Sequence, residues 1–441
     1  MATGSRMEPF LCDIAVIGAG PAGLAAAAAA AEAGRRVIIA DEGLASGGQI
    51  WRPDIRHGSP PTARSWQSRL EASCALTLSR TSIVSIRRPS ASGPLVLTGE
   101  CDGAARVIHA KRVVLATGAR ELFVPFPGWT LPGVVGVGGA QALLKSGLDV
   151  QGKRVVIAGS GPLLLPVAAS MARAGARLLV VAEQARRASV IGYATSLWRQ
   201  PSLIARAARY RAAFVRASFV TGTWVKAATA QAGRIAATLS DGHRDRVYQC
   251  DLLCAAFGLV PNTELARQMG CDVRDGRVVV DEQQRTSVLD VFCAGEPTGI
   301  GGAELALLEG ETAGRAAAGV AEASAPRRRR ARLVAQASRM NEAFALRPEL
   351  RHLADGDTIV CRCEDVRLGE IDRAWSPRQA KLYTRVGMGP CQGRICGAAL
   401  HFLFDWTHDT IREPVQPAGL STLLADAIAS EIEPHPDTTK A

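Results

Sequence analysis

The sequence predicts an α/β fold in which two strand–helix–strand units are followed by a small, partly helical C-terminal domain. Three observations support this: a glycine-rich turn after an apolar strand at residues 13–24, a second such turn at 153–164, and four cysteines in two close pairs between 361 and 396. Repeated strand–turn–helix–strand units are typical of Rossmann-like domains with parallel sheets. The 441 residues, 47% of them apolar, suffice for two or three domains with their own cores.

The first glycine turn carries the residues that open an alanine-rich helix: Gly18, Gly20, Pro21, Ala22 and Gly23. The three glycines suit, in this order, a tight turn, the close approach of a pyrophosphate, and the close packing of helix on strand. The positive N-terminal end of the helix also attracts phosphate. Asp41 ends the next strand, 18 residues after Gly23, where a carboxylate meets a ribose hydroxyl. We therefore expect a dinucleotide site, with an ordinary turn as the minor alternative.

The rest of the first unit adds candidate contacts. Glu42 follows Asp41, and Gly48-Gln49 suits a close approach to a flavin ring or phosphate, or else forms a tight loop. We expect a helix over 60–73 and strands over 82–86, 95–98, 107–110 and 112–115. The last of these strands ends in the small-residue turn Ala116, Thr117 and Gly118.

The second glycine turn repeats the first with one departure. Gly159 and Gly161 are present, but Leu164 stands where the third glycine should be. A bulky side chain there would push helix and strand apart or displace a nucleotide. Glu183 ends the following strand and favours a ribose hydroxyl, whereas Arg186 and Arg187 could accept a phosphate. NAD(H), another nucleotide and a vestigial site all remain open here.

Charge and composition exclude some functions. The net charge of +11 comes mostly from scattered arginines, and the dense run Arg327–Arg330 is best interpreted as a solvated linker or helix face. Nucleic-acid binding is the minority interpretation, and the charge could also steer an acidic partner. No run of about 20 apolar residues could span a membrane, and residues 1–10 lack a signal core, so a cytoplasmic protein is expected. The seven histidines are scattered and no catalytic acid–base pair is predicted.

The C-terminal cysteines form the pattern Cys361-x-Cys363, 27 residues, Cys391-x4-Cys396. Two close thiolate pairs can hold a [2Fe–2S] cluster. Zinc is the second choice, because structural zinc usually shows Cys-x2-Cys pairs, and four unligated thiols the third. Ser376-Pro377 predicts a helix running to about Val386, and another helix should begin near Cys396. The other cysteines, Cys250 and Cys254 among them, are expected to pack in the core, and no vicinal pair suits thiol–disulfide chemistry.

Taken together, these motifs resemble the two-dinucleotide-binding-domain flavoproteins, whose fold is that of glutathione and thioredoxin reductases. The resemblance rests on the first glycine turn, Ala116-Thr117-Gly118, the degenerate second turn, and the stretch from Val291 to Glu296. It implies that the first turn holds the ADP part of FAD and that Gly295 and Glu296 contact the ribityl chain and phosphate. The helix after Gly302 would point at the isoalloxazine. Glu296 stands where this family usually has aspartate.

The cysteine segment with its glycine-rich loop resembles the bacterioferritin-associated-ferredoxin type of [2Fe–2S] domain, with Cys361, Cys363, Cys391 and Cys396 as ligands. Nearly the full chain resembles the alpha subunits of heteromeric flavin dehydrogenases, such as those of opine oxidase, D-hydroxyproline dehydrogenase, dye-linked L-proline dehydrogenase and hydrogen cyanide synthase. The resemblance implies oxidation of an amino acid or opine at its C–N bond on a beta subunit with its own FAD. Electrons would then pass to a quinone or dye-like acceptor. Further options are a small gamma subunit, together with an FMN at the interface between subunits. Nucleic acid is not expected, and membrane contact would be peripheral, on the inner face.

The expected domains are an FAD-binding domain over 8–122 and 250–320, a second nucleotide-binding domain over 123–249, a basic linker over 321–355, a [2Fe–2S] domain over 356–412 and a tail over 413–441. Two rival functions remain. One is a self-sufficient NAD(P)H-dependent acceptor reductase, and the other a non-catalytic redox sensor.

Overall fold

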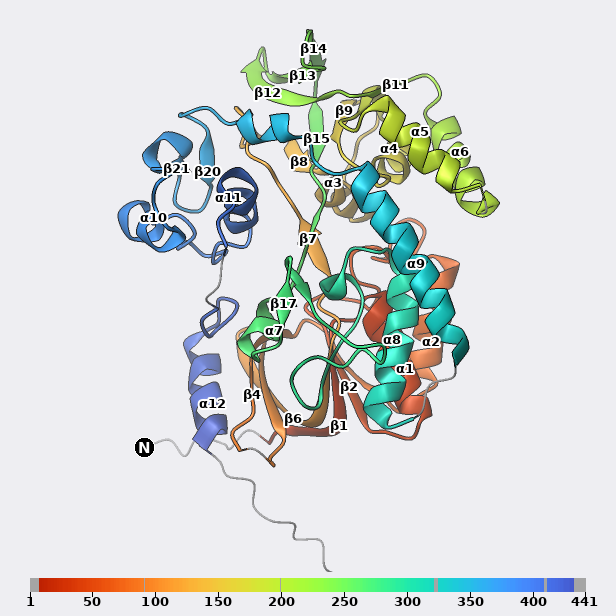
Figure 1. The fold of residues 1–441 in the computed structure, drawn as a ribbon, viewed down its shortest axis with the longest axis vertical. Coiled ribbons are helices and arrows are strands. Elements are labelled where there is room, and N and C mark those ends of the chain that lie inside the picture. Colours follow the sequence, from red (N-terminus) through yellow and green to blue (C-terminus); the bar gives the residue numbers. More distant parts are fainter. Residues whose placement is uncertain (1–7, 91, 199, 321–323, 408–410, 432–441) are drawn as a thin grey trace, which may run out of the picture.

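The computed structural model describes residues 8–90, 92–198, 200–320, 324–407 and 411–431. These form two α/β bodies, one above the other in Figure 1, with a small C-terminal domain at their side. The expected linker, [2Fe–2S] domain and tail include residues 321–323, 408–410 and 432–441, and therefore lie partly outside the described residues.

The first body is built on a seven-stranded sheet in the order β3-β2-β1-β6-β5-β4, with β19 also paired to β6. Strands β3, β2, β1, β6 and β19 are parallel, and β4 and β5 extend the sheet antiparallel. The strands are β1 (Phe10–Ile17), β2 (Val37–Ala40), β3 (Leu76–Leu78), β4 (Ser82–Arg87), β5 (Leu95–Cys101), β6 (Ala104–Leu115) and β19 (Val291–Cys293). The strands expected at 107–110 and 112–115 are thus one continuous strand, β6, and the other expected strands are confirmed.

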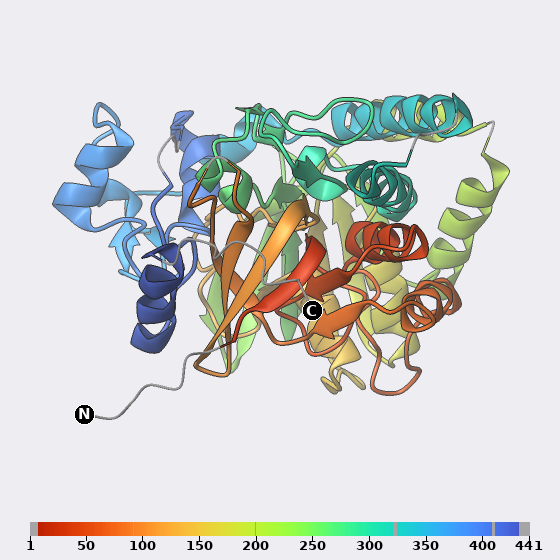
Figure 2. The same ribbon diagram turned by 90° about the horizontal axis from the view of Figure 1, so that it is seen from below.

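Helices α1 (Pro21–Glu32) and α8 (Ala303–Ala318) lie on one side of this sheet, and the small domain with α12 (Leu420–Glu431) lies on the other (Figure 2). The helix expected over 60–73 is α2 (Pro61–Glu71), which packs on α1. Helix α1 is alanine-rich because α8 crosses it very closely. A Cβ atom on Gly310 of α8 would lie 2.1 Å from the carbonyl oxygen of Ala22, so only glycine fits this crossing.

The second body has a five-stranded parallel sheet in the order β11-β10-β9-β15-β8 and a three-stranded antiparallel sheet, β12-β13-β14. Its strands are β8 (Val134–Gly136), β9 (Arg154–Gly159), β10 (Arg177–Glu183), β11 (Ser218–Thr221), β12 (Trp224–Gln231), β13 (Arg234–Ser240), β14 (Asp245–Cys250) and β15 (Leu252–Ala256). Because β15 pairs with β8 and β9, the chain returns to the first body after Ala256, and not at residue 250 as expected from the sequence.

The helices of the second body are α3 (Val137–Lys145), α4 (Leu164–Arg173), α5 (Arg187–Ser196) and α6 (Pro201–Ala213). The basic stretch expected as helix from Tyr193 to Phe219 is therefore two helices and the start of β11, with Pro201 opening α6. Two antiparallel strands, β7 (Ala119–Glu121) and β16 (Leu259–Pro261), carry the chain from one body to the other and back (Figure 1). The remaining short elements of this part are α7 (Glu264–Gln268), β17 (Val273–Arg274), β18 (Arg277–Val278) and η1 (Glu296–Thr298).

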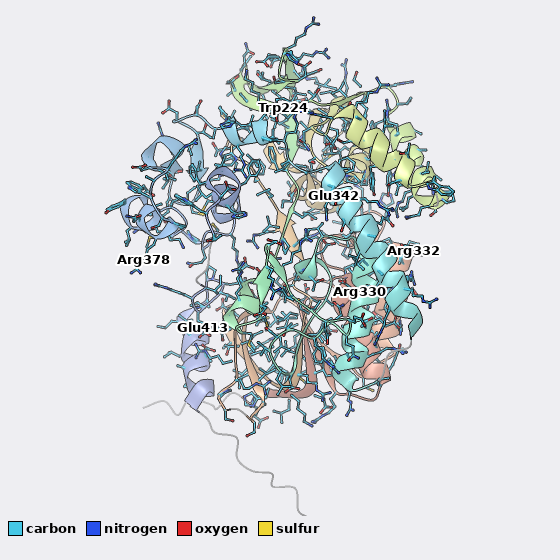
Figure 3. All side chains as sticks on the ribbon, viewed as in Figure 1. Trp224, Arg330, Arg332, Glu342, Arg378 and Glu413 are labelled. Carbon is cyan, nitrogen blue, oxygen red and sulfur yellow. The ribbon has the colours of Figure 1, made fainter. Side chains whose placement is uncertain are left out.

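The basic run lies on helix α9 (Ser324–Ala343), which extends from the first body to the second (Figure 1). Arg332 is exposed, as expected for a solvated face, but Arg330 lies on the side of α9 near α8 (Figure 3). Its guanidinium is 2.9 Å from the buried carboxylate of Glu309. One arginine of the run is therefore anchored in the first body.

The C-terminal domain contains η2 (Pro348–His352), β20 (Ile359–Cys361), β21 (Val366–Arg367), η3 (Leu368–Glu370), α10 (Pro377–Thr384) and α11 (Cys396–Phe404). Both expected helices are confirmed, and Ser376 caps α10 in a capping box with Gln379. Beyond this domain, α12 docks on β5 and β6 by its polar side. Asp426 accepts hydrogen bonds from Ser85 Oγ at 2.5 Å and Thr98 Oγ1 at 2.7 Å.

Candidate flavin and iron–sulfur sites

The first glycine turn is closed so tightly that two of its glycines are obligatory. Gly18 has a φ of +100°, and a Cβ there would lie 2.3 Å from the carbonyl oxygen of Ala116. A Cβ on Gly23 would lie 1.7 Å from the carbonyl oxygen of Gly18. The turn therefore packs helix α1 directly against the ends of β1 and β6, as the motif predicts.

The loop at Gly48 meets the same turn. A Cβ on Gly48, whose φ is +59°, would lie 2.9 Å from Cα of Gly20. Gln49 is exposed, and its side-chain oxygen accepts a hydrogen bond from Arg52 at 3.0 Å. Glu42 is also exposed. The glycine backbones thus come together, while the two polar side chains face outward.

Asp41 lies at the end of β2, beside the glycine turn. One carboxylate oxygen accepts a hydrogen bond from the backbone amide of Ala19 at 2.5 Å, and the other from that of Gly43 at 2.7 Å. The motif acid and the glycine turn are therefore in contact, at the position where the ribose of a dinucleotide is expected.

Glu296 provides a specific test of whether this body fits FAD. It follows Gly295, whose φ is +82° and whose Cβ would lie 2.8 Å from Cβ of Ala22, so the chain passes close to the start of α1. Oε1 of Glu296 accepts a hydrogen bond from the amide of Gly302 at 3.0 Å. Oε2 is buried and has no hydrogen-bond partner among the described residues, and burial raises the pKa of this carboxyl. A buried acceptor that lacks a donor fits a ribityl hydroxyl, so the longer acid suits the role of the usual aspartate.

Behind Glu296 lies Glu309 of α8, for which the motifs predicted no role. Its carboxylate accepts hydrogen bonds from the amide of Gly295 and from Thr298 Oγ1, both at 3.1 Å, and pairs with Arg330. Burial raises its pKa, although Arg330 opposes this. Glu309 therefore fixes the turn that presents Glu296. A single acid flanked by small and apolar residues in α8 was the available signal.

The turn at Ala116-Thr117-Gly118 is fixed by Asn262, which follows β16. Thr117 Oγ1 donates to the carbonyl of Asn262 at 2.6 Å, and Asn262 Nδ2 donates back to the carbonyl of Thr117 at 2.9 Å. Gly118 also accepts from the amide of Asn262 at 3.0 Å. The second crossing strand therefore locks the small-residue turn.

The second glycine turn differs from the first in its helix. Leu164 is buried in the core of the second body, and α4 begins at Leu164, whereas α1 begins at Pro21 directly after the second glycine. Relative to that glycine, α4 starts two residues later, so its amides are displaced along the chain from Gly161. Glu183 accepts hydrogen bonds from the amides of Gly161 and Ala185, both at 2.8 Å, and burial raises its pKa to about 7.

A segment after α9, which we call the strap (residues 344–347), crosses the carboxyl ends of β9 and β10. Ser160 Oγ donates to the carbonyl of Phe344 at 2.6 Å, and the fully buried Gln184 donates to that of Ala345 at 3.1 Å. The amide of Arg347 donates back to Gln184 at 3.2 Å. In a Rossmann-like unit a dinucleotide lies across these same strand ends. The strap therefore covers the part of the second site that follows Gly159.

Beside the strap, a cavity of about 500 Å³ lies between α5 and the three-stranded sheet. Its lining includes one of the two arginines noted in the sequence, Arg187, together with Arg244, Arg246 and Tyr248. Arg186 is exposed at the N-terminus of α5.

The four C-terminal cysteines come together in pairs that join the two loops. Cys361 and Cys396 hydrogen-bond through their sulfurs, which lowers the pKa of Cys361 to about 6 and raises that of Cys396. Cys363 and Cys391 are paired in the same way, with the amide of Cys391 also donating to Cys363. The amides of Gly387, Glu364 and Cys363 donate to Cys361. Amides directed at sulfur stabilise an anionic cluster, so these loops fit a [2Fe–2S] group.

Within the described residues, no group of three or more His, Cys, Asp or Glu side chains has the arrangement needed for a single metal ion. The thiols instead meet two by two. The seven other cysteines are also free. Cys250 and Cys254 are fully buried, as expected for packing, and burial raises the pKa of both. None of the described helices has the length and apolar character needed to cross a membrane.

Residues 12–323 match the family model of pyridine nucleotide-disulphide oxidoreductases. The chain belongs to this family. Residues 359–406, which contain all four paired cysteines, match the BFD-like [2Fe-2S] binding domain. The chain is thus an FAD-dependent oxidoreductase with FAD and a [2Fe–2S] cluster as its cofactors, and the fold class and these two cofactors are confirmed.

Two curated relatives are similar over most of the chain. The first of the opine oxidase subunits, from Rhizobium meliloti (strain 1021), is 34% identical, over 95% of this chain and 99% of the relative. The hydrogen cyanide synthase subunit HcnB from Pseudomonas protegens is 32% identical, over 86% of this chain and 89% of the relative. The expected resemblance to these subunits is therefore confirmed.

Among solved structures, L-proline dehydrogenase from P. horikoshii aligns over 95% of this chain and 80% of its own, with a TM-score of 0.65 and 20% identity. Thioredoxin reductase from T. acidophilum aligns over 70% of this chain and 98% of its own, with a TM-score of 0.56 and 20% identity. These similarities establish the fold of the two bodies.

Proposed function

We propose that this chain is the electron-transfer subunit of a heteromeric dehydrogenase. A partner subunit with its own FAD oxidises the C–N bond of an amino acid or opine, and this chain carries the electrons through its FAD and its [2Fe–2S] cluster to a quinone or dye-like acceptor. Two relatives named as subunits, of an opine oxidase and of a hydrogen cyanide synthase, support this proposal. The role suits a cytoplasmic protein, or one held at the inner face of the membrane through its acceptor.

The observation that carries the proposal is the meeting of Cys361 with Cys396 and of Cys363 with Cys391 in a chain that also has an FAD cradle. The buried Cys293, next to Gly295 and Glu296, has a pKa raised by burial. A thiol with a raised pKa is a poor thiolate donor. The paired cysteines are therefore the outlet for electrons, and the cofactors supply the redox chemistry while the protein orients them.

The rival NAD(P)H-dependent reductase requires a nicotinamide donor in the second body. Leu164 and the later start of α4 remove helix amides from the pyrophosphate position, and the strap occupies the ends of β9 and β10. Both features favour a partner protein over NAD(P)H as the source of electrons. Addition of NADH to the isolated holoprotein should leave its flavin oxidised, whereas dithionite should bleach it.

The direct test is to purify the chain anaerobically, by itself and together with a companion flavoprotein subunit encoded beside it. We expect dye reduction with an amino acid or opine only in the complex. In a complex made with the Cys391→Ser variant, substrate should still reduce the partner flavin while dye reduction fails. Ordinary substrate turnover by the isolated chain would contradict the proposal.

A further inference from the structure

Each of the two cysteine loops is held by one hydrogen-bond donor from outside the small domain. Arg120, on the crossing strand β7, donates through Nε to the carbonyl of Arg394 at 3.0 Å. Arg394 lies between Cys391 and Cys396. Trp129 donates through its indole nitrogen to the carbonyl of Ile359 at 2.6 Å, two residues before Cys361. Both loops are therefore tied to the α/β bodies next to their ligands.

Arg120 also belongs to the network around the flavin turn. Its Nη1 donates to Asn262 Oδ1 at 2.7 Å and pairs with Glu264 at 2.9 Å. Asn262 in turn locks Thr117 in the small-residue turn. About a quarter of the Arg120 side chain is exposed, so this charged network is largely shielded from water and its hydrogen bonds hold a defined geometry. A continuous set of hydrogen bonds thus joins the flavin turn to the loop of Cys391 and Cys396.

Trp129 is fixed in the second body. Its side chain is mostly buried, and its ring packs on Phe123 with 4.9 Å between centroids. The preceding Gly128 lies so close to β12 that a Cβ there would come within 1.8 Å of the carbonyl of Ala228. The donor of this second tie therefore stands on a rigid base. A third contact, the bidentate pair of Arg351 with Asp405, is exposed on both sides and contributes little.

From these contacts we infer that Arg120 and Trp129 are positioning residues for electron transfer between the flavin and the cluster. Neither side chain belongs to the cysteine ligands. They hold the two cysteine loops at a fixed place relative to the flavin turn, and a few tenths of an ångström of freedom in such a support weakens a functional site. The inference rests on the proposed function. In the step it concerns, the reduced flavin loses one electron and the oxidised cluster gains it, the quinone or dye-like acceptor then takes it from the cluster, and two such transfers remove the electron pair of the flavin.

The test uses the full-length chain loaded with FAD and cluster, as wild type, Trp129→Phe, Arg120→Gln and Arg120→Lys. Phenylalanine keeps the ring packing of Trp129 and removes only the N–H donor. The matched control is Arg378→Ala, which removes an exposed arginine of α10 on the outer side of the same domain (Figure 3). Flavin and iron content, the cluster reduction potential and the melting temperature are measured first. A light pulse with a deazaflavin donor then reduces the flavin, and the bleaching of the cluster is followed in time.

Loss of one hydrogen bond should shift the balance between docked and released loops about fivefold to tenfold, and slow cluster reduction by a similar factor. Trp129→Phe and Arg120→Gln should both show this, with unchanged cofactor content, potential and melting temperature. Hydrogen exchange should rise over 359–363 in the first and over 391–397 in the second. Arg120→Lys should restore part of the rate, and Arg378→Ala should match wild type.

Three results overturn the inference. Equal transfer rates and equal exchange in all variants would show that the two ties do not position the cluster. Loss of FAD or iron in both Trp129→Phe and Arg120→Gln would assign the residues to cofactor retention instead. A wild-type protein that holds both cofactors but passes no electron between them would overturn the proposed function together with the inference, and is distinguished by the failure of the wild type itself.

Discussion

Glu309 and Arg330 form an ion pair of 2.9 Å in which the carboxylate is 2% exposed and the guanidinium 26%. The pair joins two helices, α8 and α9, and stands behind the turn at Gly295 and Glu296. Removing one partner of such a pair leaves a buried charge without compensation.

The first prediction therefore concerns Arg330→Ala. We expect a loss of about 3 kcal/mol in the free energy of unfolding, because the buried Glu309 carboxylate loses its cation. FAD should also bind more weakly, since Glu309 fixes Gly295. Chemical denaturation and flavin release on dilution measure both effects. Arg328→Ala, at an exposed position of the same helix, is the control and should change neither. Equal behaviour of the two variants would contradict the structural role of the pair.

The second prediction concerns the crossing of α1 and α8. Gly310→Ala places a Cβ 2.1 Å from the carbonyl of Ala22, so the two helices must separate at the start of the FAD motif. We expect a destabilisation of about 2 kcal/mol or more and a protein with little flavin. Gly192→Ala, in α5 with open space around the new methyl group, should instead stabilise by about 0.5 to 1 kcal/mol through helix propensity. Thermal unfolding of both variants is the measurement.

The third prediction concerns the cluster ligands. Cys391→Ser should abolish the iron–sulfur absorbance and EPR signal while FAD remains bound, because the thiolate is the ligand and Cys391 lies outside the flavin body. Cys74→Ser, at an exposed cysteine of the first body, should keep both cofactors. Wild-type protein should contain about two irons per chain, as a [2Fe–2S] centre requires. A colourless wild type after careful reconstitution would contradict the assignment.

The fourth prediction is a pH dependence that comes from Glu183. Burial raises its pKa in the folded protein to about 7, above the ordinary value of 4.5, so the folded state binds the proton more tightly than the unfolded state. Stability from this group is fully present below pH 4.5 and is lost as the pH rises to about 7. The difference between 4.5 and about 7 corresponds to about 3 kcal/mol.

Glu183→Gln removes this titration. The free energy of unfolding of the variant minus that of wild type should therefore increase between pH 4.5 and 7 and be constant above pH 8. Urea unfolding of both proteins across this range gives the difference, and any constant offset from the altered hydrogen bonds with Gly161 and Ala185 drops out. A difference that does not vary with pH would contradict the raised pKa.

Local spacing predicted the parts of the sites that depend on short stretches of chain. Gly18 and Gly23 are required by contacts inside one turn, and the two cysteine pairs lie within short loops, so their chemistry is visible in the sequence. The capping box at Ser376 is local in the same way. The fold class followed from the same repeats.

The residues that the sequence did not reveal act through distant partners. Arg120 contacts Arg394, Trp129 contacts Ile359, and Asn262 contacts Thr117, in each case across more than 100 residues. The strap over the second site depends on a segment that follows the basic run, which has no nucleotide motif of its own. Periodicity and spacing carry no signal for such pairings, because only the tertiary fold brings these residues together.

Helix α9 ties two remote places to one rigid rod, since Arg330 bears on the turn of Gly295 while Phe344, just past its other end, lies on Ser160. A residue inserted between these two positions would turn one contact about 100° around the axis relative to the other and shift it by about 1.5 Å. The chain could then keep one of the two contacts but not both. The number of residues in this stretch is thereby a fixed dimension of the molecule, and substitutions along its exposed face are far safer than a change in its length.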